Sequence, residues 1–153
     1  MSRQTGLSRR LCGWRCGRLW HPEHLDTRSK IVSLQEALSA TSGKRTAVVS
    51  GYFDPLQVEH ALRLREIRAG QECVVVLVTD PPAPVLDSFS RAQLVAALDM
   101  IDYVVLPQEC ASSAGFERYG TISVYREEAA DEARLERLVR HVHDRHGAVA
   151  ARS

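Results

Sequence analysis

The residues best placed to do chemistry lie in one short stretch that runs from Ser50 to His60. This stretch follows the apolar, β-branched run 46–50 and leads directly into a predicted helix near Val58. The first N–H groups of a helix have no partner inside the helix, and together with the helix dipole they favour a phosphate. Gly51 adds a point at which a ligand can approach the backbone closely. The stretch is therefore a candidate phosphate-binding loop.

Four residues of the loop, Gly51, Phe53, Asp54 and His60, are spaced as in the motif G-x-F-D-x-x-H-x-G-H. On this spacing the loop resembles that of the cytidylyltransferase-like nucleotidyltransferases. The resemblance is strongest to the adenylyltransferase half of bifunctional ADP-heptose synthases and to glycerol-3-phosphate cytidylyltransferases. Two further segments, 30–36 and 91–105, resemble the first helix and the R-x-x-L-V-x-A-L-x-x-V-D-Y-V-V stretch of the same family.

The resemblance implies attack of a phosphate or similar oxygen on the α-phosphate of a nucleoside triphosphate, with release of pyrophosphate. Positioning and electrostatic stabilisation carry such a reaction. An active member would use Mg²⁺ with ATP or CTP, and its partner would be a nucleotide or sugar phosphate; the residues themselves indicate no certain cofactor. Carried over by position, the resemblance implies a catalytic His60 and the nucleotide-binding residues Ser50, Gly51, Tyr52, Phe53, Asp54, Gln57, His60 and Arg91.

Three positions depart from the family pattern. Gln57 replaces the first His of the motif, and Gln can donate a hydrogen bond but carries no charge. Glu59 replaces the Gly, so a carboxylate faces the mouth of a phosphate site. The family's Lys after the second strand has no counterpart, because Asp80 is followed by the proline-rich run 81–84. Losing one charge-assisted donor typically costs about 2.7–4 kcal/mol of transition-state stabilisation, so weak, altered or no transferase activity is predicted.

Three functions stay open on these residues. The first is a nucleotidyltransferase-like domain that binds a nucleotide or sugar phosphate with little or no transfer. The second is an active adenylyl- or cytidylyltransferase with a variant site. The third is a non-catalytic module that forms a homodimer. Single residues have paired interpretations as well: His60 contacts a phosphate or has no ligand, Asp54 orients a ligand or caps the turn, and Arg91 binds a nucleotide or pairs with a carboxylate.

Two groups of residues have a metal-binding composition without a convincing spacing. The pattern C-x3-C-x4-H-x2-H in residues 12–24 has a far shorter loop between its pairs than a zinc finger uses. His141, His143 and His146 lie in a predicted helix, where the first two point to different faces. We therefore predict an irregular segment for the first group, with a zinc site as the alternative, and an exposed surface for the second.

The elements that position the loop alternate between strand and helix. Strands are predicted over 46–50, 73–78, 103–106 and 121–125, and the main helices over 58–69, 91–100 and 127–146, after a short helix that begins at Leu34. Such alternation predicts an α/β fold with a Rossmann-like parallel sheet and helices on both faces. Ligands of such sheets bind beyond the carboxyl ends of the strands, where the candidate loop lies.

Local patterns predict the ends and the buried faces of these helices. Ser33 and Glu36 form a predicted capping box, Ser90 is the predicted N-cap of the third helix, and Gly147 is predicted to end the last one. Cys73 opens an apolar run and is predicted to be buried. Apolar spacing assigns inward-facing side chains. These are Leu62, Leu64 and Ile67 in the second helix, Leu94, Val95, Ala97 and Leu98 in the third, and Leu135, Leu138, Val139 and Val142 in the last.

The chain has 153 residues, of which 44% are hydrophobic and 25% charged, which is typical of one globular domain. We predict a flexible Arg-rich extension over 1–28, the nucleotidyltransferase-like domain over 29–147 and a tail over 148–153. A formal net charge of +1 gives no global attraction to nucleic acid or acidic lipid. No apolar run approaches the roughly 20 residues of a membrane helix. Because the twin arginines at 9–10 also lack a following apolar region, a cytoplasmic location is predicted.

Overall fold

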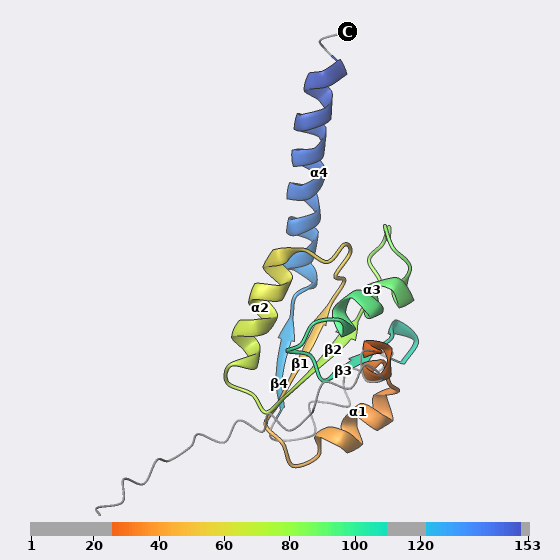
Figure 1. Ribbon diagram of the computed structural model, residues 1–153, viewed down its shortest axis with the longest axis vertical. Coiled ribbons are helices and arrows are strands. Elements are labelled where there is room, and N and C mark those ends of the chain that lie inside the picture. Colours follow the sequence, from red (N-terminus) through yellow and green to blue (C-terminus); the bar gives the residue numbers. More distant parts are fainter. Residues whose placement is uncertain (1–25, 110–121, 151–153) are drawn as a thin grey trace, which may run out of the picture.

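The computed structural model describes residues 26–109 and 122–150 (Figure 1). It contains one parallel sheet with the strand order β3-β2-β1-β4. The strands are β1 (Thr46–Gly51), β2 (Cys73–Val78), β3 (Tyr103–Val105) and β4 (Ile122–Arg126). β1 lies inside the sheet, paired in parallel with β2 on one side and with β4 on the other. The predicted α/β fold with a Rossmann-like parallel sheet is confirmed.

Helices cover both faces of this sheet. α2 (Val58–Arg68) and α3 (Ser88–Ala96) pack on one face, and α1 (Leu34–Thr41) packs on the other. The short 3-10 helices η2 (Thr27–Lys30) and η3 (Pro107–Glu109) precede α1 and follow β3. Every residue of β1 and β2 is buried, including Cys73. This burial on both faces explains why the second strand is an unbroken apolar run instead of an alternating one.

The last helix, α4 (Glu128–Ala150), starts at the carboxyl edge of the sheet and then extends away from the rest of the domain (Figure 1). It continues past Gly147, so the prediction that this glycine ends the helix is wrong. A glycine inside a helix costs only about 1 kcal/mol relative to alanine, and two alanines follow it within three residues. Among the residues that the structure describes, no helix combines the length and the apolar character needed to cross a membrane.

The predicted caps were correct for α1 and wrong for α3. The Ser33 hydroxyl accepts from the Glu36 N–H at 3.3 Å, and the Glu36 carboxylate accepts from the Ser33 N–H at 2.9 Å, which is the predicted capping box. The N-cap of α3 is Asp87, whose Oδ1 accepts from the Ser90 N–H at 2.9 Å. α3 therefore begins earlier than predicted, because Asp and Ser both cap well and the Asp comes first.

Two of the predicted inward-facing leucines are at the surface. Leu62 is 56% exposed and Leu94 is 43% exposed, and Ala97 is also exposed, whereas Leu64, Ile67 and Val95 are buried as predicted. The buried face of α3 is formed by Arg91, Ala92, Val95 and Ala96. Apolar spacing does not place an arginine in the core, so the predicted buried face of α3 contained Leu94 instead of Arg91.

Several predictions fall on residues 1–25, 110–121 and 151–153, which lie outside the described residues. They include the cysteine and histidine group of 12–24 and most of the predicted N-terminal extension over 1–28. The predicted domain boundaries therefore stay predictions.

Candidate functional site

The sheet topology places the candidate loop at the point where strand order reverses. After β1 the chain moves to β2 and β3 on one side, and it returns to β4 on the other. In open α/β sheets the ligand crevice lies at this point, beyond the carboxyl ends of the strands. The Gly51 loop (residues 51–60) follows β1 and the start of α4 follows β4, so these two segments flank the crevice. The Glu127 N–H donates to the Ser50 carbonyl at 2.8 Å and links them.

The first residues of the Gly51 loop direct two backbone N–H groups to one point. Phe53 has a φ of 50°, in the left-handed region that bulky residues rarely adopt. The N–H groups of Tyr52 and Phe53 then donate to the same oxygen, Oδ2 of Asp131, at 2.7 and 3.1 Å. A Cβ atom on Gly51 would lie 2.8 Å from this oxygen. The glycine is therefore required here for the close approach of an acidic group.

That acidic group belongs to the chain itself. Asp131 lies in the first two turns of α4, and its second oxygen, Oδ1, is 2.9 Å from Nε2 of His60 and 2.6 Å from Nη1 of Arg134. One carboxylate thus receives hydrogen bonds from two backbone amides, an imidazole and a guanidinium. Such a set of donors is what an anion-binding site uses. In this structure the anion is Asp131.

His60 is buried, with its side chain 2% exposed, and both of its ring nitrogens are engaged. Its Nδ1 accepts from the Gln57 N–H at 2.8 Å, so that nitrogen carries no proton. Its Nε2 therefore carries the proton and donates to Asp131. The imidazole packs at 5.4 Å, centroid to centroid, against the ring of Phe53. His60 thus helps to start α2 and holds Asp131, and neither nitrogen is directed to open solvent.

The environment of Asp131 keeps its carboxyl ionised. Burial by itself would raise the pKa of this carboxyl, but the hydrogen bonds from His60 and from the Phe53 and Tyr52 amides outweigh burial and hold the pKa below its usual range. Arg134 also binds Glu127 at 3.3 Å, and Glu127 accepts from Arg63 of α2 at 2.9 Å. A chain of alternating charges therefore fastens the first turns of α4 to α2 and to the Gly51 loop.

Two of the predicted nucleotide-binding residues serve as supports of the loop. Asp54 accepts from the Val85 and Leu86 N–H groups at 2.6 and 2.9 Å, and so ties the loop to the segment before α3. Arg91 is fully buried. It donates to the carbonyls of Tyr52 at 2.9 Å, Thr79 at 2.6 Å and Leu86 at 3.1 Å, and to the Asp80 carboxylate. This arrangement favours the carboxylate-pairing interpretation of Arg91.

The remaining predicted residues are not all brought to the same place. Ser50 is buried, and by the alternation of side chains along β1 it points with Val48 to the α1 face, away from the loop amides. Its hydroxyl has no hydrogen-bond partner within the described part of the chain. Gln57 is the N-cap of α2, and Glu59 is exposed in the first turn of that helix. The acidic group that meets the loop amides is thus Asp131, not Glu59.

A pocket of about 270 Å³ lies beside the loop. It is lined by Tyr52, Asp54, Pro81, Pro82, Ala83, Asp131, Glu132, Leu135 and Glu136. Four of these residues are acidic and none is basic, so the described lining has the wrong sign for a triphosphate. Nearby negative charges also act on Tyr52: burial raises the pKa of its hydroxyl, and the carboxylates of Glu132, Glu128 and Asp131 raise it further.

Sequence reasoning missed Asp131, although a signal was present. Asp131 lies four residues before Leu135, on the same face of the last helix. It therefore extends the apolar stripe of that helix toward the domain. An acidic residue at a core-facing position needs a partner, because an unpaired buried charge is very costly. That position predicts a buried carboxylate with donors around it, but it does not say which donors they are.

Of the two groups with a metal-binding composition, the structure describes only the histidines of α4, since the group of 12–24 lies outside the described residues. Within 26–109 and 122–150, no group of three or more His, Cys, Asp or Glu side chains is arranged to hold a metal ion. His141, His143 and His146 are exposed on α4, as predicted. Cys73 is buried at the start of β2, where burial raises the pKa of its thiol to about 12, so this thiol is not a ready nucleophile.

Curated relatives of the chain are bifunctional proteins named HldE. The chain is 37% identical over 98 residues to HldE of Citrifermentans bemidjiense and 35% identical over 101 residues to HldE of Trichlorobacter lovleyi. These matches cover 55% and 57% of this chain, but only 20% and 21% of the relatives. The chain therefore spans about a fifth of the length of the curated relatives it matches.

Among solved structures, the chain is similar to a lipopolysaccharide core biosynthesis protein from Thermoplasma volcanium. The sequence identity is 20% and the TM-score 0.43, and the match covers 55% of this chain and 96% of that one. No family model matches the chain. The identity to the HldE proteins, together with the motif frame of the Gly51 loop, supports the placement of this domain in the cytidylyltransferase-like nucleotidyltransferase superfamily, without the H-x-G-H pair.

Proposed function

We propose that this chain is a nucleotidyltransferase-like domain that does not carry out nucleotidyl transfer while its Gly51 loop is closed. One observation carries the proposal: the Tyr52 and Phe53 amides and Nε2 of His60, the groups that would face a phosphate, are bound to Asp131. A nucleotide or sugar phosphate stays the proposed ligand class, on the resemblance of the loop and on the identity to HldE.

The charges around the loop support the absence of transfer. Gln57 supplies no positive charge, and His60 keeps its Nδ1 unprotonated to accept from the Gln57 N–H. Removing one well-placed donor from a developing oxyanion typically lowers kcat by about 10²–10³-fold. The loss of two such donors, next to the four carboxylates that line the pocket, would leave little nucleotidyl transfer. Mg²⁺, if a triphosphate is bound, would be held by one or two carboxylates together with the phosphates, as is usual for this ion.

A pyrophosphate-release assay tests this proposal. ATP or CTP is mixed with Mg²⁺, a panel of sugar phosphates and the protein, and we expect no release above the protein-free rate. The double variant Gln57→His, Glu59→Gly restores the motif, and we expect it to stay inactive because Asp131 still holds His60. Release by the wild-type protein that His60→Ala abolishes would overturn the proposal and establish the active alternative.

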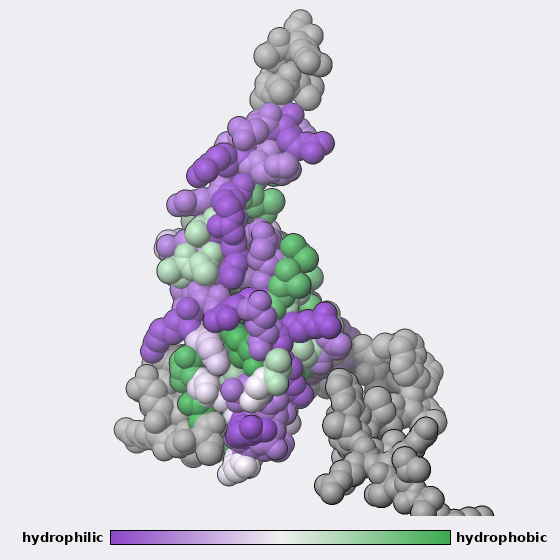
Figure 2. All heavy atoms as spheres, turned by 90° about the vertical axis from the view of Figure 1, so that its left-hand side faces the viewer, coloured by the Kyte–Doolittle hydropathy of each residue, from purple (hydrophilic) through white to green (hydrophobic). Residues whose placement is uncertain are grey.

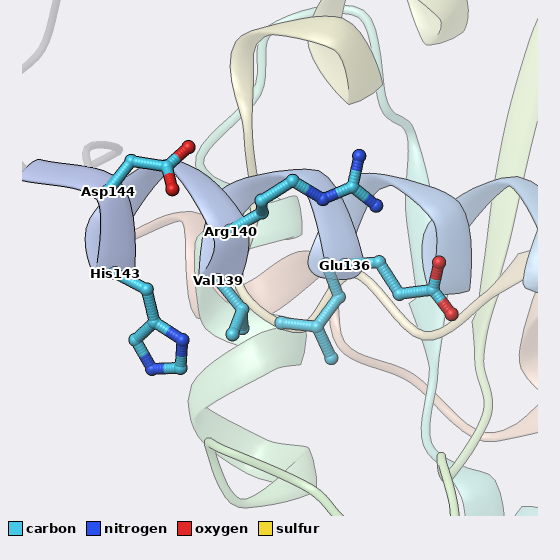
Figure 3. Close-up of a pocket in the computed structure, with 6 residues that line it drawn as sticks. Glu136, Val139, Arg140, His143 and Asp144 are labelled. Carbon is cyan, nitrogen blue, oxygen red and sulfur yellow. The ribbon is translucent and has the colours of Figure 1, made fainter.

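A second candidate function is homodimerisation through the outer part of α4. Val139 and Val142 were predicted to face inward, but each is 43% exposed, because α4 extends away from the domain that would cover them. The face seen in Figure 2 is mostly hydrophilic, with hydrophobic side chains in small patches. An open hollow of about 590 Å³ along α4 is lined by Leu135, Glu136, Val139, Arg140, His143 and Asp144 (Figure 3). Because acidic and basic residues both flank the apolar ones, an antiparallel second copy can set opposite charges across the pair.

Light scattering on the eluting protein tests the dimer. We expect a mass of twice 17.1 kDa for the wild-type chain and 17.1 kDa for the double variant Val139→Glu, Val142→Glu. Val85→Glu is the matched control, because Val85 is 64% exposed but lies outside α4, and this variant should stay dimeric. A wild-type mass of 17.1 kDa at every concentration would remove this candidate.

A further inference from the structure

We propose that Asp131 is an internal ligand that closes the anion site of the Gly51 loop. The site would take a phosphate-class oxyanion only when the first turn of α4 moves away. This inference rests on the proposed function, since it concerns the same loop, and it adds how that loop is controlled. The contact between α4 and the loop is then autoinhibitory, because it blocks anion binding by the loop.

The donors around Asp131 converge on a single carboxylate. Both amides at the start of the loop, those of Tyr52 and Phe53, converge on Oδ2 of Asp131 at 2.7 and 3.1 Å. The imidazole of His60 and the guanidinium of Arg134 meet Oδ1 at 2.9 and 2.6 Å. Converging backbone amides and side-chain N–H donors recognise oxyanions by geometry and charge, and a carboxylate and a phosphate present similar oxygens to them. The loop therefore has a formed anion site, and a side chain of α4 fills it.

The backbone around the Asp131 carboxylate has a shape that admits an anion. Gly51 leaves the space that Oδ2 of Asp131 occupies, because a Cβ atom there would be 2.8 Å from this oxygen. Phe53 holds a φ of 50°, which a non-glycine residue adopts only when its surroundings fix it. Asp54 and Arg91 provide that fixation from the other side of the loop. The amides thus stay aimed at the site by contacts that do not involve α4.

Asp131 excludes free anions because it is tethered to the same chain as the loop. A group on the same chain acts at a high effective concentration, so a dissolved phosphate must compete with a tethered carboxylate. Arg134 and Glu127 strengthen the tether, because Glu127 bridges Arg134 of α4 to Arg63 of α2. The open state is then a minor one, and the apparent affinity for an anion falls in proportion to its population.

The test compares pyrophosphate binding by the wild-type protein and by Asp131→Ser, measured by titration calorimetry at constant ionic strength. The serine removes the carboxylate and leaves the amides and His60 in place. We expect the apparent Kd of Asp131→Ser to be at least about tenfold lower than that of the wild type. Adding His60→Gln to Asp131→Ser should reverse most of the gain, because it removes the freed imidazole donor.

Glu128→Ser is the charge-matched control. Glu128 lies in the first turn of α4 and carries the same charge, whereas the loop amides donate to Asp131. We expect this variant to bind pyrophosphate as weakly as the wild type. An equal gain in Glu128→Ser and Asp131→Ser would mean that lost negative charge alone explains the binding, and the proposal would fail. It would also fail if folded Asp131→Ser, checked by circular dichroism, gains no affinity.

A measurement on the wild-type protein covers the case in which Asp131→Ser does not fold. In a pyrophosphate titration followed by NMR, the amide resonances of Tyr52 and Phe53 should either keep their positions or shift together with that of Asp131, because an anion enters only when Asp131 leaves. A saturable shift of the Tyr52 and Phe53 resonances without a shift of the Asp131 resonance would overturn the proposal. The proposed function fails on a different result. It is overturned only if the wild-type protein carries out nucleotidyl transfer, whereas the results above overturn only the role of Asp131.

Discussion

Arg91→Ala is expected to lower the free energy of unfolding by about 3–5 kcal/mol, because it removes a fully buried side chain and leaves the three carbonyls that accept from it without a donor. The reason is that Arg91 is fully buried and joins three segments: the Gly51 loop, the end of β2 and the segment before α3. The variant leaves three carbonyls and the Asp80 carboxylate without their donor. Since a domain of this size is stable by only about 5–15 kcal/mol, much of the stability would be lost.

Thermal and denaturant unfolding measure this effect. The melting temperature of Arg91→Ala should fall by about 10 °C or more. Arg65→Ala is the matched control, because Arg65 is an exposed arginine within α2, and it should change stability by less than about 0.5 kcal/mol. If the two variants unfold alike, Arg91 is not the support of the loop described above, and its nucleotide-binding interpretation regains weight.

Asp131→Asn is expected to lower the free energy of unfolding by about 2–3 kcal/mol at neutral pH, because hydrogen bonds to a charged acceptor are among the stronger ones. The effect should depend on pH. The folded protein holds the pKa of Asp131 below its ordinary value of 3.8. The stabilisation by the ionised carboxylate is therefore fully present above pH 3.8, and it is lost as the pH falls through the lowered pKa of the folded state.

Urea unfolding of the wild type and of Asp131→Asn, repeated from neutral to acidic pH, measures this difference. The comparison removes the contributions of the other carboxylates, since both proteins contain them. The stability difference should be constant above about pH 5 and should shrink as the pH falls below 3.8. A difference that does not change with pH would contradict the charged, hydrogen-bonded state of Asp131 on which the closed loop depends.

Asp131 also separates two explanations for the proposed absence of nucleotidyl transfer. The sequence attributed it to Gln57 and Glu59, which replace motif residues. The structure adds a second cause, because Asp131 already occupies the loop amides and His60. Glu59 itself is exposed on α2. Restoring the motif at Gln57 and Glu59 and removing Asp131 are therefore distinct experiments. Both changes together would be needed to rebuild a phosphate site.

Much of the fold could be predicted because its signals are local. The unbroken apolar run 73–78 specified a strand buried on both faces, and the Ser33–Glu36 pair specified where α1 begins. Where local signals compete, prediction failed. Asp87 and Ser90 both suit an N-cap, and Arg91 holds a buried position that apolar spacing gave to Leu94. The partners of Arg91 are carbonyls and a carboxylate brought together by other segments, which no spacing within α3 encodes.

The sequence by itself determined the α/β fold, the position of the Gly51 loop before a helix, and the departures at Gln57 and Glu59. Each of these depends on residues a few positions apart. Only the tertiary structure decided what the loop binds, because the N–H of Tyr52 meets Asp131 from 79 residues further along the chain. That contact requires β4 to pair beside β1, so that α4 begins at the carboxyl edge of the sheet. The strand order, a long-range property, thus decided that the anion site is filled from within.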